Sequence, residues 1–287
     1  MSLYAYEDDL LVYAAEAEER RPYRCSGCGS PVRVRKGPSR VPHFYHLARA
    51  SSCRLYSKSE DHLLAQLSLK KLLPAGETVI ERPFPRILRV ADVAWETRKI
   101  IFEIQCSFLT PREAEHRMED YQTAGYQVVW ILDDRIFNRK ILRPAEQLVR
   151  LFPCYYATLR KGDPIFYDQF EIFHRNYRIK KGHHLKIHIE KPRTLPSFSW
   201  EEDRFPSQII QKAAKTSLYF QGDLLHKALL SEAIPMLAIS MQNLRALERL
   251  SVKEAKQKVS LLRKVIKKIF LEPFGILMFF LLERAAR

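Results

Sequence analysis

Two short apolar runs, residues 89–95 and 100–107, constrain the fold more than any other part of the chain. They read RVADVAW and IIFEIQCS, and a polar turn at residues 96–99 separates them. Runs of this length, rich in Val, Ile, Phe and Trp, favour antiparallel strands joined in a hairpin. Each run carries one acid, Asp92 or Glu103, where an ordinary strand would carry an apolar residue.

The positions of the two acids indicate a metal site. A hairpin centred on the turn places Asp92 opposite Glu103 on one face of the sheet. Like charges at such positions destabilise a sheet unless something compensates them. Mg²⁺ or Mn²⁺ does so, since a hard divalent cation takes carboxylate oxygens while it binds a phosphate.

Two further residues belong to this hypothesis. Gln105 lies on the same strand face as Glu103, and Glu60, in the first turn of the preceding helix, offers another oxygen or orients a water molecule. The alternative is an edge hairpin whose acids face solvent and pair with Arg89 or Lys99.

Helical and strand-like segments alternate around the hairpin. Residues 57–73 predict an amphipathic helix with Ser59 as N-cap, and residues 77–84 a strand. Residues 111–125 predict a second helix, and the following VVWIL segment a buried strand. The order α-β-β-β-α-β predicts a mixed sheet with helices on its faces, in the α+β or α/β class.

A cluster of Cys and His residues near the start of the chain predicts a structural zinc site. Cys25 and Cys28 form a C-x-x-C knuckle, and His46 and Cys53 complete a Cys3His set. His43 competes with His46, which we prefer because it follows the aromatic run and lies nearer Cys53. The alternative is a group of ordinary buried thiols with a surface His pair.

Composition narrows the class of protein. Lys and Arg number 48 against 33 acids, a net charge of +15 that favours a polyanionic partner such as DNA or an anionic membrane surface. The odd number of cysteines, the C-x-x-C pair and the lack of a signal-peptide pattern indicate the reducing cytoplasm. The most apolar run, residues 274–282, is too short to span a membrane and suggests a buried helix end or a partner contact.

Changes in composition and periodicity divide the chain into four regions. They are a Cys/His module, a mixed α/β core, a basic region with β character and a basic helical region, at residues 1–56, 57–152, 153–206 and 207–287.

The pattern D-x(10)-E-x-Q on consecutive strands resembles the PD-(D/E)XK nuclease fold. The segments CSGC, PHFYH, SEDH, ADVAW, EIQCS, R-MEDY and VVWIL, between residues 23 and 133, resemble more specifically the competence protein CoiA family. This resemblance implies a restriction-endonuclease-like core behind a zinc-finger-like module, in a protein of natural transformation or recombination.

The resemblance also implies roles for individual residues. Asp92 and Glu103 would bind the catalytic metal, and Glu60 would be the helix acid. Gln105 occupies the position at which PD-(D/E)XK nucleases usually have Lys. A neutral amide can hydrogen-bond but cannot offset charge in the transition state. Binding of metal and DNA is therefore a firmer expectation than cleavage.

Helix spacing adds a nucleic-acid contact to the hypothesis. Arg117 and Tyr121 are four residues apart on one helix face, where they contact a phosphate or pack as a surface pair. His62 and His116 are not expected to act as the catalytic base, since metal-dependent hydrolysis already has an activated water.

The leading hypothesis is an Mg²⁺- or Mn²⁺-dependent DNA endonuclease of DNA uptake and recombination, which hydrolyses phosphodiesters with water activated by the metal. One alternative is a zinc-containing DNA-binding or scaffold protein whose nuclease fold has lost turnover. Another is an adaptor that recruits recombination or uptake proteins through residues 274–282.

Overall fold

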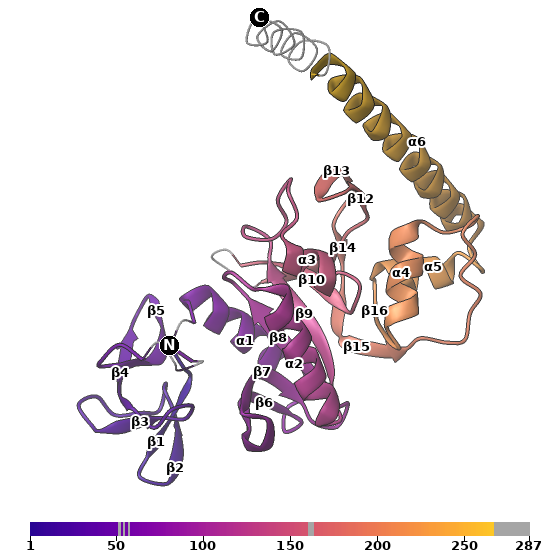
Figure 1. The fold of residues 1–287 in the computed structure, drawn as a ribbon. Helices are drawn as coiled ribbons and strands as arrows, with labels where there is room; N and C mark the ends of the chain where they lie inside the picture. Colours follow the sequence, from indigo (N-terminus) through magenta and orange to yellow (C-terminus); the bar gives the residue numbers. More distant parts are fainter. Residues whose placement is uncertain (51–52, 54, 57, 160–163, 267–287) are drawn as a thin grey trace, which may run out of the picture.

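The computed structural model describes residues 1–50, 53, 55–56, 58–159 and 164–266 (Figure 1). A small β module at the N-terminal end leads into a mixed α/β core, and a group of helices follows, the last of which projects away from the body. The residues 274–282, for which a partner contact is predicted, lie outside the described residues.

The N-terminal module is an antiparallel sheet of five strands in the order β2-β1-β3-β4-β5. Apolar side chains of these strands form a small core of their own, which includes Ala5, Tyr23, Val32 and Phe44. The two Cys residues Cys25 and Cys53 are buried in the same core. The strands are Tyr4–Glu7, Leu10–Tyr13, Tyr23–Cys25, Pro31–Gly37 and Arg40–His46.

The core is a sheet of seven strands in the order β14-β11-β10-β9-β8-β7-β6. Strands β8, β9 and β10 run parallel, and the other neighbours are antiparallel. The strands are β6 Thr78–Phe84, β7 Arg89–Trp95, β8 Ile100–Gln105, β9 Gln127–Asp133, β10 Cys154–Thr158, β11 Ile165–Asp168 and β14 Leu185–Lys186.

This architecture confirms the predicted mixed sheet and the order α-β-β-β-α-β from α1 to β9. The predicted boundary at residues 152–153 falls between the helix α3 (Pro144–Val149) and β10, so the large sheet continues beyond it. Its parallel centre is nearly all apolar because helices cover both faces.

Helices cover the sheet from opposite sides. Leu63 and Leu69 of α1 (Glu60–Leu72) pack on the face that carries Val93 and Phe102. The other face packs against α2 (Pro111–Thr123) and α3 (Pro144–Val149). Ser59 caps α1 by accepting the backbone N–H of His62, as the sequence predicts.

Several of the remaining elements form a fourth apolar cluster. It joins β12 to the helices α4 and α5 and to the first turns of α6, a helix that runs on from Pro235 to Ile266. In the part of the chain that the structure describes, no helix is both long and apolar enough to cross a bilayer. The other elements are β12 Glu171–His174, β13 Tyr177–Lys181, β15 His188–Thr194, α4 Ser207–Lys215, β16 Leu218–Gln221 and α5 Leu224–Leu230.

Candidate active site and metal centre

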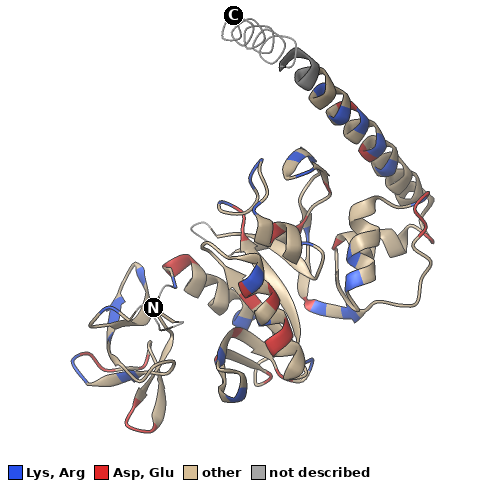
Figure 2. Cartoon of the chain, in the orientation of Figure 1, with Lys and Arg blue, Asp and Glu red and all other residues tan. Residues whose placement is uncertain are grey.

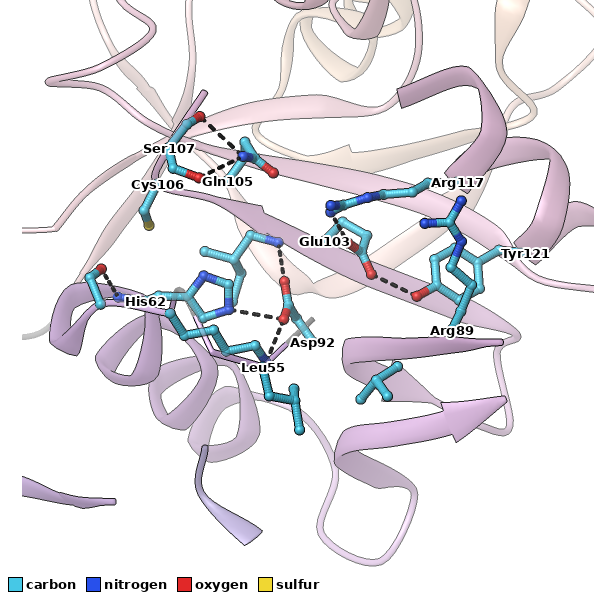
Figure 3. Close-up of a pocket in the computed structure, with 14 residues that line it drawn as sticks. Leu55, His62, Arg89, Asp92, Glu103, Gln105, Cys106, Ser107, Arg117 and Tyr121 are labelled. Carbon is cyan, nitrogen blue, oxygen red and sulfur yellow. Dashed lines mark hydrogen bonds and ion pairs between the residues drawn. The ribbon is translucent and has the colours of Figure 1, made fainter. Parts of the chain in front are cut away.

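A pocket opens where strands β7 and β8 separate (Figure 3). The pairing of the two strands runs from Trp95 opposite Ile100 to Val93 opposite Phe102, the register that the sequence predicts. One step further the next facing residues are Asp92 and Glu103, and both line the pocket. The cavity has a volume of about 110 Å³.

The carboxylate of Asp92 is buried against the side of α1. Its Oδ1 lies 2.9 Å from Nε2 of His62 and 2.8 Å from Nζ of Lys58, and its Oδ2 accepts the backbone N–H of Ile104. Burial would raise the pKa of Asp92, but the charges of His62 and Lys58 outweigh it and hold that pKa well below its usual range. Asp92 is therefore an anion over the whole physiological range.

The carboxylate of Glu103 is held from the opposite side, by α2. Its Oε1 accepts the hydroxyl of Tyr121 and its Oε2 accepts Nη1 of Arg117, both at 2.9 Å. Burial, reinforced by the charge of Asp92, raises the pKa of Glu103 above its usual value. The two acids therefore share one pocket but are supported by different helices, with opposite effects on their pKa values.

Gln105 also lines the pocket and is 5 % exposed. Its amide nitrogen donates to the backbone oxygen of Ser107 at 3.0 Å and to the Ser107 hydroxyl at 3.2 Å. The Gln105 side chain is thus fixed by the turn after β8, and its amide oxygen remains a neutral acceptor (Figure 3).

Arg117 and Tyr121 lie on one face of α2, as predicted, but that face packs on the sheet. Tyr121 is 1 % exposed and its hydroxyl is engaged by Glu103, so in this structure it does not reach a surface where DNA could lie. Arg117 lines the pocket and bonds Glu103 and Glu113. A phosphate contact remains a prediction for Arg117.

The structure does not bring Glu60 to this pocket. Its Oε1 accepts the backbone N–H of Val41 in β5 at 3.0 Å, so the Glu60 side chain ties α1 to the N-terminal module. The rotation of α1 explains the difference, because His62 and Gln66 occupy the face that meets Asp92.

Sequence reasoning missed Lys58 and Arg89, which line the pocket, and it gave His62 no role there. Arg89 is held by Glu113 and Asp120 of α2. Burial would lower the pKa of Lys58, but Asp92 and Glu81 outweigh it and raise that pKa. Lys58 lies two residues before the first residue of α1, and this position is the sequence feature that could have indicated its place near the helix that faces Asp92.

The donor set of the pocket suits a hard divalent cation. Two buried carboxylates and the amide oxygen of Gln105 are the oxygen ligands that Mg²⁺ and Mn²⁺ prefer. A cavity of about 110 Å³ also leaves room for the few water molecules that Mg²⁺ retains.

The Cys/His cluster lies in the N-terminal module. The ligand atoms of Cys25, Cys28, His46 and Cys53 all lie within 4.8 Å of one another. The sulfurs of Cys25 and Cys53 are 3.6 Å apart, and Sγ of Cys28 is 3.3 Å from Nε2 of His46. These separations are close to the ~3.5–3.8 Å expected for ligands that share one tetrahedral zinc.

His43 is not part of this cluster. It is 2 % exposed, and its Nδ1 lies 2.8 Å from the backbone oxygen of Val41. The Cys3His group that the structure assembles is the predicted one with His46, and it can hold a metal ion such as zinc.

Comparison with protein-family models gives two matches. Residues 12–56 match the model described as "Competence protein CoiA, N-terminal domain", and residues 58–188 match "Competence protein CoiA, nuclease-like domain". The first contains the Cys3His cluster and the second contains the whole pocket except Leu55. Searches of curated proteins and of solved structures found no match.

Proposed function

The chain belongs to the competence protein CoiA family, and we propose that it is a divalent-metal-dependent nuclease that hydrolyses DNA phosphodiesters during DNA uptake, transformation or recombination. The observation that carries this proposal is the pair Asp92 and Glu103, two buried carboxylates on adjacent strands that line one pocket. Buried acids on facing positions are costly to a fold, which favours a functional reason for them.

The proposed reaction is in-line attack of water on the phosphodiester, in which a water oxygen–phosphorus bond forms and one phosphorus–oxygen ester bond breaks. The attacking water loses a proton to solvent, and the leaving oxygen takes up a proton from solvent to become a hydroxyl. A divalent cation, when bound, polarises the phosphoryl oxygen and activates the water. Asp92 and Glu103 would hold that cation, and the amide oxygen of Gln105 would orient water by accepting its hydrogen bond.

Charged side chains in the pocket and in the N-terminal module support the choice of DNA. The mouth of the pocket includes Arg117, whose side chain is 26 % exposed and can turn from Glu113 to a phosphate. No acid occurs from residue 20 to residue 59, and β4 and β5 carry several of the basic residues of this stretch (Figure 2). Such a surface binds the backbone without reading sequence.

We also propose a zinc ion at Cys25, Cys28, His46 and Cys53, which would stabilise a module with a very small core. None of the cysteines in the described residues forms a disulfide, which supports the cytoplasm as the place of action.

The experiment is cleavage of plasmid and single-stranded DNA by the full-length protein with Mg²⁺ or Mn²⁺. Wild type is compared with Asp92→Ala, Glu103→Ala and, as a matched control, Glu115→Ala on the exposed side of α2. Loss of cleavage in the first two variants alone supports the proposal. Undiminished cleavage in both would refute the site assignment.

A second candidate function is a DNA-binding or scaffold protein without turnover, which recruits recombination or uptake proteins. It is favoured by the ion pairs that already neutralise both acids, Lys58 with Asp92 and Arg117 with Glu103. It predicts salt-sensitive DNA binding without cleavage, and the same binding in Glu103→Ala.

A further inference from the structure

Three acids lie in a row across three neighbouring strands of the core. In the pairing of β6 with β7, Ile80 faces Val93 and Arg82 faces Ala91, so Glu81 lies opposite Asp92. The register of β7 with β8 places Glu103 beyond Asp92 in the same row. The third acid, Glu81, is therefore next to the proposed metal ligands but does not line their pocket.

Glu81 has an unusual backbone. Its φ angle is +51°, in the left-handed region that side-chain-bearing residues rarely adopt, although it lies within a strand. Such a conformation is strained and persists only where surrounding contacts impose it. Glu81 is also 5 % exposed, so its carboxylate is held by the protein and not by solvent.

Those contacts come from two other parts of the chain. Oε2 of Glu81 accepts the backbone N–H groups of Leu3 and Tyr4, at 3.0 and 3.3 Å, at the start of β1. Its Oε1 lies 3.2 Å from Nζ of Lys58. One carboxylate thus joins the first strand of the N-terminal module to Lys58.

Lys58 lines the pocket and contacts two acids of the row, Asp92 and Glu81. Its ammonium lies 2.8 Å from Asp92 and 3.2 Å from Glu81, and its side chain is 8 % exposed. An ammonium has three N–H donors, and among the described residues these two acids are its partners, which leaves one donor for a ligand in the pocket. The other two cations of the pocket, Arg89 and Arg117, also pair with two acids each, and they share Glu113 of α2.

We propose that Lys58 is the catalytic cation of this pocket and that Glu81, anchored by the strand β1, is the residue that positions it. The inference rests on the proposed function. Lys58 donates a hydrogen bond to a non-bridging phosphate oxygen as the water oxygen–phosphorus bond forms and the ester bond breaks, and it transfers no proton. It supplies the positive charge that Gln105 does not.

Glu81 acts through Lys58. Its negative charge and its fixed backbone draw the lysine side chain to one place, which lowers the reorganisation needed when charge develops on the phosphate. Because Leu3 and Tyr4 hold Glu81, the N-terminal module is part of the active site and not a separable appendage.

The test uses the full-length variants Lys58→Met, Lys58→Arg, Glu81→Gln and the double variant Glu81→Gln with Lys58→Met. We expect Lys58→Met to lower kcat roughly 10²-fold with little change in KM, and Lys58→Arg to restore part of it. Glu81→Gln should lower kcat roughly tenfold in wild type and have no further effect beside Lys58→Met. Lys71→Met, on the exposed side of α1, is the matched control.

A second measurement separates catalysis from folding. Mn²⁺ affinity, followed by electron paramagnetic resonance, should stay or tighten in Lys58→Met, because a positive charge has left the surroundings of Asp92. A variant that had merely lost its fold would bind Mn²⁺ more weakly.

The outcomes distinguish the two proposals. Cleavage that needs Asp92 and Glu103 but survives Lys58→Met overturns the role of Lys58, and an equal effect of Glu81→Gln in both backgrounds overturns the role of Glu81. Cleavage that is unchanged in both the Asp92 and the Glu103 variants overturns the proposed function and, with it, the role of Lys58. The absence of cleavage by wild type does the same.

Discussion

The hydroxyl of Tyr121 donates to Oε1 of Glu103 at 2.9 Å, so the helix α2 holds one of the two acids of the pocket from within the core. The bond is buried, and Tyr121 itself is 1 % exposed. A residue in this position acts on the carboxylate and not on the DNA surface. That distinction can be measured.

We expect Tyr121→Phe to lower metal-dependent cleavage roughly tenfold, since partners that orient a ligating carboxylate usually contribute that much. DNA binding measured by fluorescence anisotropy in EDTA should not change. Tyr126→Phe is the matched control, because its hydroxyl bonds Glu96 outside the pocket. Weaker DNA binding with normal metal affinity would restore Tyr121 as a nucleic-acid contact.

Asp92→Asn should destabilise the protein by about 3 kcal/mol at pH 7, because it removes the carboxylate charge that Lys58 and His62 share and leaves Lys58 with Glu81 alone. The folded-state pKa of Asp92 is depressed, so its stabilising effect is present above the ordinary pKa and is lost only below it. The deficit of Asp92→Asn should therefore stay constant from pH 7 down to pH 5. Urea unfolding in EDTA checks both statements.

Glu103→Gln should show the opposite dependence on pH. The folded-state pKa of Glu103 is raised by burial and by Asp92, so its contribution is favourable below the ordinary pKa and is lost as pH rises through the folded-state value. The stability of wild type relative to Glu103→Gln should thus fall as pH rises from about 4.5 towards 7. The same urea series measures it, and a difference that is flat or rises with pH would contradict the raised pKa.

His46→Ala and His43→Ala should separate the two candidate zinc ligands. We expect His46→Ala to lose zinc on dialysis against a mild chelator and to melt at a lower temperature, because a Cys3His site needs its fourth ligand. His43→Ala should keep its zinc, because the buried His43 ring lies outside the Cys3His cluster. Metal content by atomic absorption, read beside the melting curve, is the measurement. Zinc loss in His43→Ala alone would reverse the assignment.

Gln105→Lys should restore part of the cleavage that Lys58→Met removes, by roughly tenfold, because both positions line the pocket and a single cation is needed there. In the wild-type background the same change should bring little gain, and it should weaken Mn²⁺ binding by adding a like charge. A folded double variant that binds Mn²⁺ but shows no recovery would contradict a shared role for the two positions.

The strand pattern predicted the central features of the core. The apolar runs and the polar turn between them determine the hairpin register, and Asp92 and Glu103 are the residues that follow its last pair, Val93 and Phe102. The spacing of thiols and imidazoles likewise predicted the Cys3His group, since a knuckle and a hairpin leave few ways to bring four ligands together. Both features depend on residues that are close together in the sequence, which is why the sequence pattern predicts them.

The rest depends on contacts between distant segments. Glu60 follows the N-cap of α1 and looks like a site acid, but the helix packs through Leu63 and Leu69, and this rotation turns Glu60 towards β5. Glu81 reads as one more charge in a strand, and only its contacts with β1 and Lys58 give it a role. The periodicity of a sequence does not predict such contacts between distant segments.

The row of Glu81, Asp92 and Glu103 also limits how the family can vary in length. Successive residues of a strand point to opposite faces, so one residue gained or lost in the turn at 85–88 or at 96–99 would move an acid out of the row. Both turns lie between strands, where insertions usually cost little. Here the lengths of the two turns set the register of the strands. Related chains that keep the pocket should therefore keep these lengths, even where the residues within the turns differ.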